Sequence, residues 1–194
     1  MLSQIRDLLG SFIFNDLNNL CVNTDPEQRY KVYVATDNDK YVEVCMQEWY
    51  QQQTCQEYIT DPQKQFLLPL MFHIDETGTD MFQRHPLEPL MFMSGITRDF
   101  IQERSSFWRH TGFTPKVVKG KNSCKSLQLC HECMVMVLST LKPLEDNPPL
   151  EWLQFGDEPP VQKELMVQVC FLMGDQKSQD NIVGRKLNNS GWTG

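Results

Sequence analysis

The sequence has no excess of positive charge, because 18 Lys and Arg residues stand against 25 Asp and Glu residues among 194 and give a formal net charge of −7. Free-standing basic nucleic-acid-binding modules usually carry the opposite sign, so the balance disfavours that class. The sequence also lacks an apolar run near the roughly 20 residues of a membrane span. Asp7 interrupts the N-terminal segment, and no apolar core of a signal peptide follows it. We therefore expect no association with a membrane.

The sequence also lacks the glycine-rich motifs that bind nucleotide phosphates, since neither a P-loop nor a G-x-G-x-x-G pattern occurs. It has no internal repeat. The apolar fraction of 40% is nevertheless typical of a folded globular protein. A chain of this length can bury one sizeable hydrophobic core.

Seven cysteines are present, and both their odd number and their irregular spacing argue against a disulfide framework. We expect free thiols in an intracellular protein. Cys130 and Cys133 form one C-x-x-C pair, which is half of a zinc site. The segment also has a helical pattern, which would turn both thiols toward the core. Core packing is therefore favoured over zinc binding, with the zinc alternative left open.

Hydrophobic periodicity predicts a mixture of strands and helices. The expected strands cover residues 31–35 and 41–46 as a hairpin, 66–74, 87–96, 152–155 and 165–173. A mildly amphipathic helix is expected within residues 1–24, and the strongest helix covers residues 126–142 and ends at Pro143. Pro89 indicates that its strand is an edge strand or contains a bulge.

Two apolar strands end abruptly in an aspartate, Asp75 after residues 66–74 and Asp175 after Gly174. Carboxylates at the tips of adjacent buried strands can hold Mg²⁺, which prefers oxygen ligands. Two such ions activate water and stabilise a leaving oxygen in phosphodiester chemistry. The alternative is a structural role, because aspartate is common where a strand gives way to a turn.

Five segments in this order resemble the catalytic core of Plavaka-type transposases, a eukaryotic DDE group related to the Kyakuja–Dileera–Zisupton elements. They are residues 67–80 (LLPLMFHIDETGTD), 84–92 (RHPLEPLMF), 108–115 (WRHTGFTP), 129–134 (LCHECM) and 174–185 (GDQKSQDNIVGR). Each segment is short, so the resemblance is specific only when the five segments are taken together. It covers about residues 40–190.

The resemblance implies an α/β fold with an RNase H-like mixed sheet. Residues 63–194 would form an incomplete core, and residues 1–62 an N-terminal extension with a short helix and a hairpin. The implied activity is Mg²⁺- or Mn²⁺-dependent cleavage and transfer of DNA strands. Asp75 corresponds to the first catalytic, metal-binding acid, and Asp175 to the second, with Asp180 as the alternative. The implied partner is DNA, bound through a larger parent protein, and the implied location is the nucleus.

A DDE core needs a third acid from a distant helix, and no residue here matches it, since Glu76 and Asp80 are too close to Asp75. We therefore expect a fragment that does not complete a catalytic cycle alone. A non-catalytic α/β interaction module is the alternative function. A small metal-dependent nuclease with a locally complete site is a third hypothesis.

The remaining candidates each have a structural interpretation that we favour. Arginines that could contact phosphate are Arg84, Arg98, Arg104, Arg109 and Arg185. Solvation or internal ion pairs with Glu88, Asp99 and Glu103 are favoured for them.

Aromatic residues of the segment after the second strand could stack on bases, but a place in the core is favoured for Phe107, Trp108 and Phe113. His73 shares a strand face with Asp75. A buried, hydrogen-bonded imidazole is favoured there over a metal ligand.

Overall fold

The computed structural model describes residues 1–20, 56–74, 87–115 and 123–174, and the predicted hairpin at 31–46 lies outside these ranges. The helices are α1 (Leu2–Leu9), α2 (Phe12–Asn15), the 3₁₀ turn η1 (Leu17–Asn19), α4 (Gln56–Tyr58), α5 (Asp99–Gln102), η4 (Ser105–Phe107), α6 (Ser123–Ser139) and α7 (Lys142–Asp146). The strands are β1 (Gln65–Ile74), β2 (Leu87–Ser94), β3 (Arg109–Pro115), β4 (Leu150–Leu153) and β5 (Val161–Gly174).

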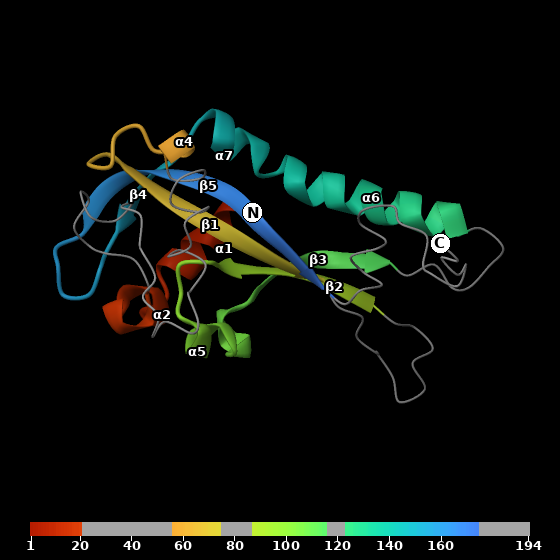
Figure 1. Cartoon of the computed structure of the whole chain (residues 1–194), viewed down its shortest axis with the longest axis horizontal. Helices are drawn as coiled ribbons and strands as arrows, with labels where there is room; N and C mark the ends of the chain where they lie inside the picture. The colour runs from red at the N-terminus through yellow and green to blue at the C-terminus, as the bar shows by residue number, and fades with distance from the viewer. Residues whose placement is uncertain (21–55, 75–86, 116–122, 175–194) are drawn as a thin grey trace, which may run out of the picture.

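The five strands form one mixed sheet in the order β3-β2-β1-β5-β4. β2 runs antiparallel to both β1 and β3, β5 runs parallel to β1, and β4 runs antiparallel to β5. The helices α6 and α7 lie between the first three strands and the last two along the chain. As Figure 1 shows, α6 and α7 lie along one side of the sheet, and α1, α2 and α5 lie on the other. The expected α/β class is therefore confirmed in its general form.

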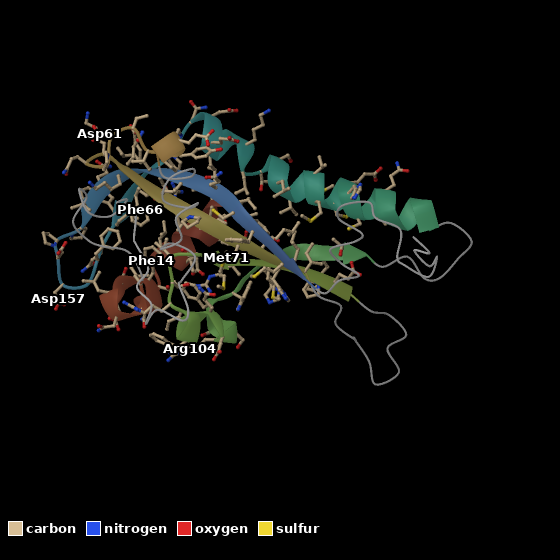
Figure 2. All side chains as sticks on the ribbon, viewed as in Figure 1. Phe14, Asp61, Phe66, Met71, Arg104 and Asp157 are labelled. Atoms are coloured by element: carbon tan, nitrogen blue, oxygen red, sulfur yellow. The ribbon has the colours of Figure 1, made fainter. Side chains whose placement is uncertain are left out.

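β1 is the central strand, and the prediction that it is buried on both faces is confirmed. Eight of its ten residues are buried, because β2 and β5 flank it and helices cover both faces of the sheet. Phe66 stacks at a tilt against Phe155, with ring centroids 5.3 Å apart, and Phe72 packs against Phe92 at 5.8 Å. Such aromatic pairs add to the stabilisation from area burial alone. Figure 2 shows Phe66 and Met71 along this strand.

The N-terminal helix α1 closes the concave face of the curled sheet. Ile5 and Leu8 of this helix are fully buried in the same core as the strands. Its adjacent residues Arg6 and Asp7 reach strands from opposite edges of the sheet. Arg6 donates to Glu151 of β4, at 2.7 Å, and Asp7 accepts from Arg109, the first residue of β3, at 2.6 Å. The sheet therefore curls around α1 as part of a barrel.

Several details of the predicted elements differ from the structure, among them the strand expected at 152–155, which is β4 at Leu150–Leu153. β2 is not an edge strand, because β1 and β3 flank it. The β2–β3 register shifts between Leu90 and Met91, but the extra residue is Thr111 of β3, so this bulge does not lie in the proline-containing strand. The helix expected to run to Lys142 ends at Ser139, and Pro143 lies in the first turn of α7, where its missing N–H costs nothing. β3 was not expected as a strand.

Among the described residues, no helix is both long enough and apolar enough to cross a bilayer.

Candidate functional site

The candidate site lies at the point where β1 and β5 end. These strands are parallel neighbours, and their last residues, Ile74 and Gly174, are register partners. In the sequence, Asp75 and Asp175 follow these two residues directly. Both aspartates, and the alternative Asp180, lie outside the described residues.

A bulge in β5 sets the level at which the two strands end. Residues 65–70 pair with residues 164–169, an offset of 99, whereas residues 71–74 pair with residues 171–174, an offset of 100. Cys170 is the extra residue on β5. If Cys170 paired with Met71 and no bulge were present, Ile74 would pair with Met173, and Gly174 would extend one residue past the end of β1. The later offset of 100 is also the separation between the two aspartates in the sequence.

The thiol of Cys170 is unreactive at neutral pH. Burial raises the pKa of its thiol from an ordinary value near 9 to about 12, so the thiol stays protonated at neutral pH. Only the thiolate is a good nucleophile or metal ligand. The role of Cys170 that the structure shows is therefore that of the extra residue in the bulge of β5.

His73 lies one residue before the end of β1 and packs against an aromatic ring. Its imidazole meets the indole of Trp108 edge to face, with centroids 5.5 Å apart. Trp108 is fixed in turn, because its Nε1 donates to the carbonyl of Gln102 at 2.9 Å. His73 is half-buried, and within the described ranges no three His, Cys, Asp or Glu side chains are grouped as metal ligands.

The thiols of Cys130 and Cys133 are free and half-buried on α6, next to the buried Met134. Burial raises the pKa of the Cys130 thiol, and the nearby charge of Glu88 and the second thiol raise it further. Glu88 is itself buried and accepts a hydrogen bond from Thr114 Oγ1 at 3.0 Å. Partial burial next to the core agrees with the packing role expected for both cysteines.

Of the candidate arginines, Arg109 is engaged within the protein. Its Nε donates to Asp7 and its Nη1 to the carbonyl of Ser106, at 2.6 and 2.8 Å. An internal ion pair was expected, but with a different carboxylate. Arg98 and Arg104 are exposed, whereas Arg84 and Arg185 lie outside the described residues.

The aromatic residues divide in a way that the sequence did not reveal. Phe107 is fully buried and Trp108 half-buried, as expected for core residues. Phe113 is exposed, so the prediction of a core position is wrong for it. Phe113 belongs to the unexpected strand β3, and the position of its side chain follows from strand alternation there.

Sequence reasoning also missed the carboxylate of Glu88 as a buried group and β4 as an exposed apolar edge. The Glu88–Thr114 contact joins register partners of β2 and β3, so it becomes visible only when these strands are paired. Comparison with family models, with curated proteins and with solved structures found no match for the chain.

Proposed function

We propose that the chain is derived from a transposase and contains part of an RNase H-like DDE core for metal-dependent DNA strand cleavage and transfer. The order of its elements supports this proposal. Three strands in an antiparallel arrangement are followed by the helices α6 and α7, by the edge strand β4 and then by β5, which pairs in parallel with the central strand β1. In an RNase H-like core, the first acid follows the first strand and the second acid follows the strand after the first helix. Parallel pairing with β1 makes β5 the counterpart of that strand, and β4 is an additional edge strand that precedes it.

The observation on which the proposal rests is the pairing of Ile74 with Gly174. If the same register extends by one residue, Asp75 and Asp175 stand opposite each other on neighbouring strands. Adjacent strands are about 4.8 Å apart, which is close enough for two carboxylates to share an ion. Asp180 lies five residues further along the sequence than Asp175. Asp175 is therefore the better candidate for the second acid.

In the proposed site, the carboxylates of Asp75 and Asp175 would hold Mg²⁺ or Mn²⁺ where β1 and β5 end. The ion would supply Lewis acidity for attack on a DNA phosphodiester. The rigid, buried β1 would fix the position of the first carboxylate. The third acid of the family has no counterpart in this sequence, so we propose that the chain does not perform the full reaction by itself.

The second candidate function is a non-catalytic α/β interaction module that retains the fold. The specific observation in its favour is the exposed apolar edge strand β4, which bears no relation to metal chemistry. It would predict a folded chain without specific affinity for divalent ions.

Titration of the purified full chain with Mn²⁺, followed by the electron paramagnetic resonance signal of the free ion, separates these two functions. We expect Asp75→Asn and Asp175→Asn each to weaken binding at least about tenfold. Asp157→Asn, an exposed change in the β4–β5 connection, is the control and should leave binding unchanged.

The set of variants that lose Mn²⁺ binding shows which aspartate is the second acid and which function the chain has. Loss of binding in Asp180→Asn and not in Asp175→Asn would move the second acid to Asp180. Absence of Mn²⁺ binding by the wild-type chain would favour the interaction module. Cleavage of supercoiled DNA that disappears in Asp75→Asn would indicate a locally complete nuclease and would contradict the inactivity of the lone chain.

A further inference from the structure

The strand β4 forms one edge of the sheet, and among the described residues no other strand pairs with its outer side. The direction of its backbone groups follows from one hydrogen bond, in which the N–H of Leu165 donates to the carbonyl of Pro149 at 2.8 Å. In an antiparallel ladder, the bonded positions alternate with positions that point away. The N–H and C=O groups of Leu150 and Trp152 therefore point away from β5.

The same two residues expose large apolar side chains. Leu150 is 56% exposed and Trp152 is 66% exposed, and their alternation places both on one face of β4. The intervening Glu151 lies on the opposite face, where it pairs with Arg6. Natural sheets commonly protect an edge with charged side chains. This edge presents an aromatic and an aliphatic residue beside backbone groups that no other strand of the described part of the chain pairs with. A row of such groups fits another extended strand.

The charge around β4 indicates the chemistry of that strand. Residues 145–158 contain five carboxylates and no Lys, Arg or His. The carboxylates outside the strand are exposed at both of its ends, Glu145 and Asp146 before it and Asp157 and Glu158 after it. Figure 2 places Asp157 at the far end of the molecule, in the connection between β4 and β5. Such a surface repels phosphate and anionic lipid, and it attracts basic groups.

We propose that the outer edge of β4 binds an extended peptide segment of another protein, with apolar side chains in its centre and basic residues at its ends. The peptide adds a sixth strand to the sheet by pairing its backbone with Leu150 and Trp152. Its apolar side chains pack against these two residues, and its basic ends meet the two acidic pairs. A second copy of this chain is a poorer occupant, because antiparallel pairing of two β4 strands brings the acidic ends of both copies together.

The test uses the full chain and a fluorescein-labelled synthetic peptide in which alternating valine and threonine residues are flanked by two lysines at each end. Binding is followed by fluorescence anisotropy. We expect saturable binding, weakened at least about tenfold by Trp152→Lys, because this change removes the central aromatic contact and adds a like charge. The control is Val135→Lys, an equally exposed apolar residue on α6 at 67%, which should not change the affinity.

Two further peptides test the two parts of the recognition. Methylation of alternate backbone nitrogens on the pairing edge should abolish binding if the strand adds by hydrogen bonding. Replacement of the lysines by glutamates should abolish it if the acidic ends attract the peptide. Equal binding of either peptide and the parent peptide would overturn the proposal.

Other occupants produce different results. A wild-type chain that is a dimer in analytical ultracentrifugation and becomes a monomer on Trp152→Lys would assign the edge to a second copy and overturn the peptide proposal. Absence of binding by the parent peptide to a monomeric wild-type chain would also overturn it. None of these outcomes changes the result expected in the Mn²⁺ titration. The peptide experiments therefore test the edge of β4 separately from the proposed metal site.

Discussion

Ile74 and Gly174 are partners in the parallel ladder of β1 and β5, although 100 positions separate them in the sequence. This pairing places the ends of the two strands at one level of the sheet. It depends on the bulge at Cys170, which changes the register over the last four pairs. The pairing can be tested directly, without any assumption about metal or DNA.

The double variant Ile74→Cys/Gly174→Cys should form a disulfide on mild oxidation. Neighbouring strands place Cα atoms about 4.8 Å apart, within the range of about 4.4–6.8 Å that a disulfide spans. Peptide mapping by mass spectrometry distinguishes this link from those of the native cysteines. The control pair Ile74→Cys/Leu172→Cys is displaced by two residues and should remain reduced, and a link in the control alone would show that the register is wrong.

Phe72→Ala should lower the free energy of unfolding by about 3–5 kcal/mol, because it removes a fully buried ring from β1 and leaves a cavity against Phe92. Phe113→Ala removes the same side chain from an exposed position on β3. It should change stability by less than about 0.5 kcal/mol. Urea titration followed by circular dichroism measures both values, and similar losses for the two variants would be inconsistent with the described core.

Gly156→Ala should destabilise the fold by about 1–2 kcal/mol. Gly156 has φ of +60°, and an added Cβ would lie 3.1 Å from Cδ1 of Leu17. Gly112→Ala is the matched control, because no heavy atom lies within 4 Å of a Cβ built there. The same denaturant titration should find Gly112→Ala within about 0.5 kcal/mol of the wild type. A larger loss for Gly112→Ala than for Gly156→Ala would contradict the described connection after β4.

The half-buried thiol of Cys170 should make stability fall at alkaline pH. Its folded-state pKa of about 12 lies above its ordinary value near 9, so the folded protein keeps a proton that the unfolded chain releases. The stabilisation is complete below about pH 9 and is lost as the pH rises toward 12. The slope should be below about 1.4 kcal/mol per pH unit, because the half-buried thiolate keeps part of its hydration.

Cys170→Ala removes this titrating group and keeps the residue that forms the bulge. The difference in unfolding free energy between variant and wild type should therefore diminish as the pH rises from 9 to 11. A difference that is constant across this range would show that the thiol titrates normally in the folded protein.

The parts of the fold that the sequence predicted are those with strong local patterns. The apolar run of β1, the run of β5 up to Gly174 and the helical spacing of α6 each identify an element without reference to the rest of the chain. β3 was missed because Arg109 and His110 begin it and Gly112 interrupts it, so its local propensity is weak. It is a strand because β2 supplies its hydrogen-bonding partner, and that partnership is a tertiary effect.

The candidate site was predicted as two strand ends, and the neighbouring positions of Ile74 and Gly174 agree with the arrangement that the prediction required. The roles of Asp75 and Asp175 remain predictions. The closure of the concave face by α1 had no sequence signature. Ile5 and Leu8 of α1 pack into the core, and the salt bridges of Arg6 and Asp7 join the helix to strands at opposite edges of the sheet. No local pattern shows that those edges converge.

The position of β1 between β2 and β5 also determines the order in which the sheet can be completed during synthesis. β2 follows β1 closely along the chain, so this pair can form early. β5 ends about 100 residues after β1, and the loop that the pairing must close is correspondingly long. Until Gly174 has left the ribosome, the apolar strand β1 has one open edge. During this interval the unpaired edge can pair with another chain, which is a route to aggregation.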